Sequence, residues 1–245
     1  MLRSLILALF LASTARAAGL PENCSQLIVG LAPDWNAVHG RLVWLDKSGA
    51  AWQRQAGPLP ILFGKNGLAW GAGIAGQDEA GLRKRERDGR APAGIFRLGE
   101  IYTYDASLPP GSDYPFHQVT EADVWSDDPR SPSYNRHVVI DPKNPPDSYS
   151  HEKMRGGDFA YRWLIEIRHN SDPPVPGDGS AIFFHTRRGI DRPTAGCTTM
   201  ARDDLVSLIA WLRAARHPCY VLLTRDEYGA KWQKWNLPAL EILGL

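Results

Sequence analysis

Short runs of apolar and β-branched residues, separated by glycine, proline and polar turn residues, recur along most of the chain. Such runs predict strands. They lie at residues 26–31, 41–45, 51–54, 59–63, 91–99, 137–140, 159–168, 181–185 and 220–224. The turn D-K-S-G at residues 46–49 predicts a hairpin between the second and third of these strands.

One segment follows the period of a helix instead. Four apolar residues stand at i, i+3, i+4 and i+7, namely Leu205, Leu208, Ile209 and Leu212. We expect basic residues in the last turn of this helix and a proline stop, provided by Arg213, Arg216, His217 and Pro218. Residues 238–245 are weakly helical. The pattern predicts a β-rich α+β domain with one main helix.

Three stretches fit neither pattern cleanly. The glycine-rich residues 64–74 lack G-K-[ST] and a following helix, so a bent strand pair carrying Trp70 is favoured over a phosphate site. The run R-K-R-E-R-D-G-R at residues 83–90 mixes both charge signs and predicts a solvated loop. Residues 105–135 are polar and turn-rich, and a loop of this length is usually functional or carries short elements of its own.

The first residues are typical of a signal peptide. A basic start precedes the apolar residues 5–12, and Ala15-Arg16-Ala17 fits a small-x-small cleavage site. The apolar run is too short to span a bilayer. We expect residues 1–17 to be removed, leaving one domain at 18–245 that is exported to the periplasm or cell envelope without a membrane anchor.

The bulk numbers are ordinary for a globular protein. The 245 residues are 43% hydrophobic, and the formal net charge of +1 does not favour a nucleic-acid partner. Of the three cysteines, Cys24 and Cys219 lie near the two ends and are candidates for a disulfide in an oxidising compartment, which would leave Cys197 free. No C-x-x-C or H-E-x-x-H occurs, so the sequence calls for no metal or other cofactor.

Cys197 and His185 form a candidate catalytic pair. His185 closes the apolar run A-I-F-F-H, and Cys197 follows Gly196 twelve residues later in P-T-A-G-C-T. An imidazole near a thiol can take its proton and form an ion pair. Gly196 suits a sharp turn, and the amides of Gly196 and Cys197 can point at an oxyanion. The alternative is that both residues are simply buried core residues.

These residues resemble the active-site signature of the YkuD-like L,D-transpeptidases. The similar segments are A-I-F-F-H and T-A-G-C-T-T-M-A-R-D-D-L, with further blocks upstream, and the resemblance covers most of residues 60–225. It implies a mixed β-sandwich-like fold and a two-step acyl transfer on peptidoglycan stem peptides. Cys197 would attack the amide after the third stem residue, release D-alanine and hold a thioester, with His185 as the base.

Two departures from the family pattern stand near the cysteine. Ala195 replaces a histidine, and Thr199 replaces an arginine or asparagine that commonly faces substrate. Arg187 and Arg188 are candidates to bind a stem carboxylate, or are solvated loop charges. Trp70, Trp125 and Tyr134 are candidates to line the groove, although most of the tryptophans are expected in the core.

Three functions stay open at this stage. The resemblance favours a transpeptidase, and a carboxypeptidase or endopeptidase that hydrolyses stems or cross-links would use the same thioester. A catalytically silent wall-binding module is the alternative outside enzymes, because of Ala195 and Thr199. The third stem residue, the acceptor and the oligomeric state are not predicted.

Overall fold

The computed structural model describes residues 19–245, so the expected signal peptide at 1–17 lies outside the described residues. The strands are β1 (Gln26–Ala32), β2 (His39–Ser48), β3 (Ala51–Leu62), β4 (Leu68–Trp70), β5 (Ala91–Thr103), β6 (Phe116–Gln118), β7 (Asp123–Ser126), β8 (Arg136–Val139), β9 (Trp163–Ile167), β10 (Phe183–Thr186), β11 (Thr198–Met200) and β12 (Cys219–Thr224). The helices are α1 (Tyr149–Glu152), α2 (Arg202–Trp211), α3 (Arg225–Lys231) and α4 (Leu240–Leu243), with 3₁₀ turns at Phe159–Tyr161 and Ala214–Arg216.

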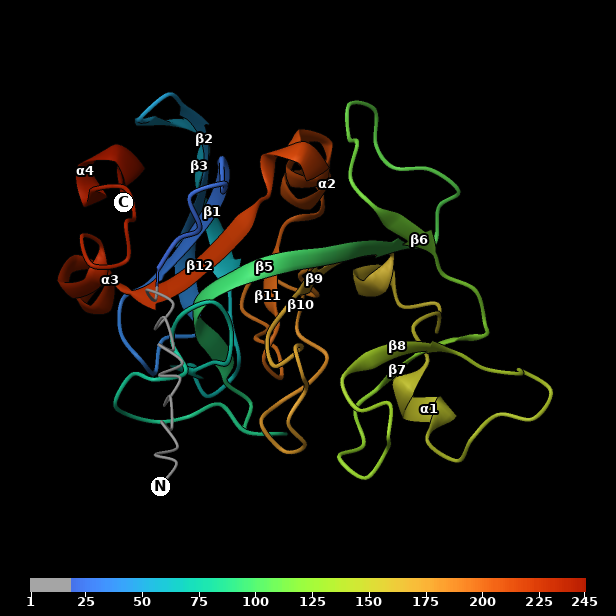
Figure 1. Ribbon diagram of the computed structural model, residues 1–245. Coiled ribbons are helices and arrows are strands. Elements are labelled where there is room, and N and C mark those ends of the chain that lie inside the picture. Colours follow the sequence, from blue (N-terminus) through green and yellow to red (C-terminus); the bar gives the residue numbers. More distant parts are fainter. Residues whose placement is uncertain (1–18) are drawn as a thin grey trace, which may run out of the picture.

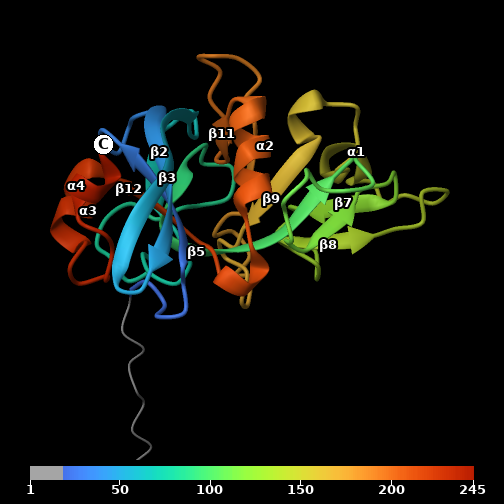
Figure 2. The same ribbon diagram turned by 90° about the horizontal axis from the view of Figure 1, so that it is seen from above.

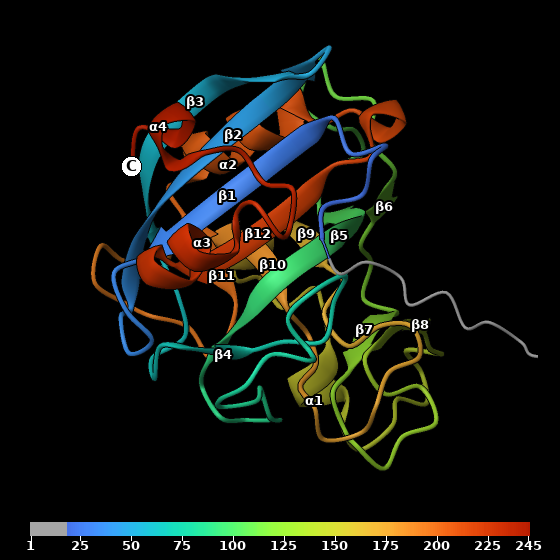
Figure 3. The ribbon, with the colours of Figure 1, turned by 60° about the vertical axis from the view of Figure 1, so that its left-hand side comes forward.

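Eight of the strands close into a barrel. Their order is β12-β1-β2-β3-β11-β10-β9-β5, and β5 pairs again with β12. The long strand β5 makes this closure, since its first half pairs with β12 and its second half with β9. Figure 3 shows β2, β1, β12 and β5 side by side along one wall. A closed ring leaves none of these strands with an unpaired edge.

A hairpin of β7 and β8, together with α1, forms a second lobe beside the barrel. Figure 1 shows this lobe apart from the barrel strands and on the side away from α3 and α4. The expectation that residues 105–135 carry short elements is confirmed, because β6 and β7 lie within them. The lobe packs on the barrel through a small apolar cluster that includes Tyr102, Trp125 and Phe183.

The main core fills the barrel. Phe184, Met200 and Tyr220 belong to it, and their neighbours along each strand point the other way because side chains alternate across a sheet. Phe183 and His185 are therefore on the outer face of β10, toward the second lobe. This alternation decides which residues can meet outside the barrel.

The main helix is confirmed as α2, which packs against β10. Figure 2 shows α2 at the centre of the molecule, beside β11. Its predicted end is wrong: the backbone leaves the helix at Leu212, where ψ is 138°. The basic residues expected in its last turn instead belong to or flank a separate 3₁₀ turn, Ala214–Arg216. Strand β11 separates Cys197 from the start of α2, so Cys197 does not belong to the first turn, where the helix dipole is strongest.

Other boundaries also differ from the prediction. Residues 51–54 and 59–63 lie in or next to one long strand, β3, and the apolar run at 159–168 begins as a 3₁₀ turn before β9. The glycine-rich stretch forms only the short strand β4. None of the helices within residues 19–245 has the length and apolar character needed to cross a membrane.

Candidate active site

A cavity of about 400 Å³ lies outside the barrel, next to the second lobe, and both Cys197 and His185 line it. We call it the Cys197 cavity. Its other walls come from β10, from the loop before β11, from the charged loop after β4 and from the second lobe. The lining residues used below are Lys84, Glu86, Trp125, Asp127, Glu152, Tyr161, Phe183, Arg188, Arg192 and Thr194.

Strand pairing brings the thiol and the imidazole to the same face. β10 and β11 run parallel, with Phe184 opposite Thr198 and His185 opposite Thr199. One further rung places Cys197 opposite Phe183, two residues along from His185. Two rises of ~3.3 Å and one strand spacing of ~4.8 Å separate the Cα atoms of Cys197 and His185 by about 8 Å. Two side chains leaning toward each other can span that gap.

His185 is positioned as a neutral base. Its Nδ1 lies 3.0 Å from the carbonyl oxygen of Thr186, which can only accept, so Nδ1 carries the proton and Nε2 keeps its lone pair. Burial lowers the pKa of His185 to about 4. The hydrogen bond to the Thr186 carbonyl raises this pKa, and the charge of Arg188 lowers it. The ring of Tyr161 packs edge-on at 5.3 Å and fixes the orientation of the imidazole.

Cys197 is positioned as a neutral thiol. Its Sγ donates to the carbonyl oxygen of Ala181 at 3.4 Å. Ala181 has a φ of +54° and is held by a hydrogen bond from its amide to Asn135 Oδ1. Burial raises the pKa of Cys197 to about 11, although the Phe183 backbone and Lys84 lower it.

The expected ion pair is therefore wrong for the free protein. In the part of the chain that the structure describes, no hydrogen bond joins Cys197 to His185, and their pKa values of about 11 and about 4 keep both neutral at pH 7. The two side chains line one cavity, and each makes its hydrogen bond to a backbone carbonyl instead. Hydrogen bonds of this kind are often loose before substrate binds and tighten in the complex.

The loop before the cysteine is fixed by Thr194. Its Oγ1 accepts from the Gly196 amide at 3.0 Å and donates to the Cys197 carbonyl at 2.7 Å. The Gly196 amide is thus occupied, and the Cys197 amide remains the candidate oxyanion donor. Gly196 has a φ of +156°, and a Cβ there would lie 2.9 Å from the carbonyl oxygen of Arg90, so glycine is required.

The two candidate arginines differ. Arg188 lines the cavity, but its Nε donates to Asp158 at 3.0 Å and its guanidinium lies over the Tyr161 ring at 4.7 Å. Because Nη2 also binds Asp158, the bidentate fork expected for a substrate carboxylate is already used. Arg187 does not line the cavity; it lies near Asp204 of α2, whose pKa it lowers against the effect of burial.

Thr199 and Trp70, both candidates to face substrate, do not line the Cys197 cavity. Thr199 lies beside His185 in the ladder and is 1% exposed, and its buried hydroxyl has no hydrogen-bond partner among residues 19–245. Trp70 belongs to the barrel core, where its indole donates to Ala80 and packs edge-on against Trp35. Pairing along β11 and burial in the barrel decide these positions, and neither is visible from the local motif.

Lys84 is a cavity residue that the sequence did not suggest. The charged run was expected to be a solvated loop, yet the Lys84 side chain is 3% exposed, and its ammonium lies 2.6 Å from Asp88 Oδ1. Gly196 and Gly179 pack closely around its aliphatic stem. Lys84 therefore places a buried positive charge near the thiol. Ala195, which stands where the family has a histidine, supplies no titratable group there.

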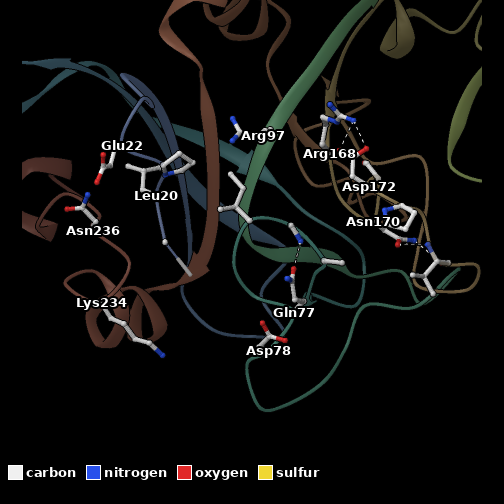
Figure 4. Close-up of a pocket in the computed structure, with 18 residues that line it drawn as sticks. Leu20, Glu22, Gln77, Asp78, Arg97, Arg168, Asn170, Asp172, Lys234 and Asn236 are labelled. Atoms are coloured by element: carbon white, nitrogen blue, oxygen red, sulfur yellow. Dashed lines mark hydrogen bonds and ion pairs between the residues drawn. The ribbon is translucent and has the colours of Figure 1, made fainter. Parts of the chain in front are cut away.

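A larger hollow of about 760 Å³ lies elsewhere on the protein, lined in part by Arg97, Arg168 and Asp172 (Figure 4). No cysteine or histidine lines it. It offers neither a nucleophile nor a neutral base of the kind found at Cys197, so the smaller cavity is the better candidate for chemistry.

Cys24 and Cys219 lie next to each other as two buried thiols. The Cys219 side chain, aided by burial, raises the pKa of Cys24, and hydrogen bonding to Cys24 lowers the pKa of Cys219. The structure holds them unbridged. Their adjacency keeps the disulfide as a proposal.

A thiol and a neutral imidazole that line one cavity, with the Cys197 amide as the candidate oxyanion donor, form the arrangement of enzymes that transfer acyl groups through cysteine. The chain belongs to the YkuD family: the family model for the L,D-transpeptidase catalytic domain matches residues 36–221. The family defines it as an L,D-transpeptidase-type peptidoglycan enzyme, and the β-barrel fits this fold. Comparisons with curated proteins and with solved structures give no match.

Proposed function

We propose that the protein is an exported L,D-transpeptidase that acts on peptidoglycan stem peptides through a thioester at Cys197. The observation that carries the proposal is the meeting of Cys197 and His185 at one cavity, with His185 Nδ1 committed to a carbonyl and Nε2 free to accept a proton. Membership of the YkuD family supports the same chemistry.

The first step forms the acyl-enzyme. Substrate in the cavity excludes water and brings the scissile carbonyl to the thiol. His185 Nε2 takes the thiol proton as the sulfur attacks the carbonyl carbon, and the Cys197 amide donates a hydrogen bond to the negative charge that develops on the carbonyl oxygen. The C–N bond breaks, and the leaving amine of D-alanine takes the proton from His185. A neutral starting pair suits this step, because the proton then moves only during the attack.

The second step transfers the acyl group. An acceptor amine attacks the thioester carbonyl, and His185 Nε2 takes the proton from the amine. The C–S bond then breaks, and His185 returns this proton to the sulfur of Cys197. An amine from another stem gives a cross-link, whereas water gives a hydrolysed tripeptide. Both products come from one intermediate, so the acceptor that occupies the cavity decides the reaction.

The charges around the cavity support a peptide substrate with groups of both signs. Arg188 and Arg192 provide positive charge, and Glu86, Asp127 and Glu152 provide carboxylates. Burial raises the pKa of Asp127, and Glu152 and Glu86 raise it further. A cationic amine of the substrate would relieve this repulsion. Arg192 suits a carboxylate of the substrate, because Arg188 already binds Asp158.

Product analysis tests the proposal. The purified protein is incubated with disaccharide-tetrapeptides, and mass spectrometry scores cross-linked dimers, trimmed tripeptides and released D-alanine. We expect dimers from the wild type and from the matched thiol control Cys24→Ala, and none from Cys197→Ala or His185→Gln. Tripeptides without dimers would indicate a carboxypeptidase, and cleavage of purified dimers an endopeptidase. Unchanged stems, with no adduct from a carbapenem, would contradict the proposal and favour a wall-binding module.

Export is proposed from the sequence pattern of residues 1–17. The test is N-terminal sequencing of the protein recovered from the cell envelope. A mature terminus at residue 18 or 19 supports export, and an intact Met1 on all of the protein in the cytoplasm contradicts it.

A further inference from the structure

Two histidines and one aspartate converge on a single point outside the Cys197 cavity. Oδ1 of Asp123, on β7, lies 2.7 Å from Nε2 of His117 on β6 and 2.6 Å from Nε2 of His137 on β8. The three potential ligand atoms all lie within 4.8 Å of one another. Three different strands supply them, so no short sequence motif announces the cluster.

We propose that His117, Asp123 and His137 bind a zinc ion. Two imidazole nitrogens and a carboxylate oxygen are donors that Zn²⁺ takes in tetrahedral sites, with a fourth position left for water. At metal–ligand distances of about 2.0–2.1 Å, the ligand atoms of such a site stand roughly 3.3 Å apart. The two N···O separations, 2.7 and 2.6 Å in the structure, therefore need to open by roughly 0.6–0.7 Å.

The carboxylate is already held in place for this role. Asp123 is 1% exposed, and its second oxygen accepts from the Thr120 amide at 2.7 Å and from the Thr120 hydroxyl at 2.6 Å. Hydrogen bonds of this kind orient a metal ligand and are part of most metal sites. Oδ1 is left to point at the two imidazoles.

The imidazoles are fixed and reachable. The two rings lie 4.8 Å apart, and the ring of Tyr102 packs against both, at 6.0 Å from His117 and 5.1 Å from His137. Their side chains are 36% and 18% exposed, which gives an ion a path from solvent and leaves room for a water ligand.

The position of the cluster gives it a structural role. It ties β6, which pairs with β5 of the barrel, to the hairpin of the second lobe. Tyr102 also packs edge-on against Trp125 at 5.8 Å and Phe183 at 6.5 Å, and these two residues line the Cys197 cavity. A bound zinc ion stabilises that wall without touching Cys197, so this inference does not depend on acyl transfer.

Calorimetric titration with zinc chloride tests the proposal, after chelator treatment of the full-length mature protein. A Cys197→Ser background removes competition from that thiol. We expect one equivalent of zinc to bind and to raise the melting temperature. Loss of an outer-shell partner commonly weakens metal sites 10–100-fold, so His117→Gln and His137→Gln, which lose a ligand, should weaken binding by about 100-fold or more.

The controls separate ligand loss from damage to the fold. His39→Gln removes an exposed histidine outside the cluster, at 3.8 Å from Asp191, and this variant should bind zinc like the parent protein. Asp123→Asn is a second test if it folds, and His117→Gln changes the most exposed member if it does not. A Co²⁺ spectrum without a thiolate charge-transfer band excludes cysteine ligands. No zinc uptake by the parent protein, or equal uptake by the His117 and His137 variants, would overturn the proposal and leave a hydrogen-bonded clamp.

Discussion

The raised pKa of the Cys197 thiol determines how the free protein reacts with iodoacetamide as the pH changes. Only the thiolate reacts, and burial raises the pKa from its ordinary value of 9.0 to about 11. At pH 7 about one thiol in ten thousand is then ionised, about a hundredfold fewer than for an ordinary cysteine. We expect the rate of alkylation to rise about tenfold per pH unit from pH 6 to pH 10, without a plateau.

The role of His185 in this experiment is equally specific. Its pKa of about 4 keeps it neutral above pH 6, and it makes no hydrogen bond to the thiol among the described residues. His185→Gln should therefore leave the alkylation profile of the free protein unchanged while abolishing turnover. Peptide mapping after timed alkylation isolates Cys197 from the buried Cys24 and Cys219.

A plateau between pH 6 and 8 that disappears in His185→Gln would refute this reasoning. It would mean that an imidazolium holds a thiolate before substrate arrives, as the sequence alone suggested. If the rate of alkylation rises tenfold per pH unit in both the wild type and His185→Gln, the proton leaves the thiol only after substrate binds.

Three further predictions concern stability and redox state. Burial lowers the pKa of both His185 and His169 to about 4, so between pH 6.5 and pH 4 the unfolded chain binds protons that the folded chain does not. The free energy of unfolding should therefore fall as the pH drops from about 6.5 to about 4. Urea titrations across this range should show a smaller fall for His169→Gln. If His169→Gln loses stability with pH as steeply as the wild type, the fall does not come from protonation of His169. Thr199→Val removes a buried hydroxyl without a partner in the described chain and should raise the free energy of unfolding by about 1 kcal/mol; a loss of stability would show that the hydroxyl is bonded. If Cys24 and Cys219 form a disulfide, the oxidised and denatured protein should titrate with one free thiol, and the disulfide should add about 2–4 kcal/mol to the free energy of unfolding. Three free thiols would exclude the disulfide.

Most strands were predictable because their signal is local. Apolar runs between turn residues marked β1, β2, β5, β8, β10 and β12. The closure of the barrel was not predictable, because the pairing of β5 with both β12 and β9 joins segments far apart in the chain. The helix α3 carried a signal that was overlooked: Thr224 stands three residues before Glu227, the spacing of a capping box, and it accepts from the Glu227 amide.

The site was predictable where a motif fixes it and not where tertiary packing does. Cys197 and His185 meet at one cavity as their spacing indicated. The burial of Lys84 was not predictable, because a run of mixed charges is usually solvated and the residues packed against its stem, Gly196 and Gly179, are about a hundred residues away in the sequence. Thr199 shares a face of the sheet with Cys197 and His185, but its side chain is buried and does not line the cavity, and its distance from the cysteine in the sequence cannot show this.

Intact-mass measurement of the acyl-enzyme tests the central claim most directly. The protein is mixed with a tetrapeptide stem, quenched in acid within one turnover and mapped by peptide. The account predicts a tripeptidyl thioester on Cys197 in the wild type and in Cys24→Ala, and none in Cys197→Ala. Unchanged turnover by Cys197→Ala, or an acyl group mapped to any other residue, would contradict it.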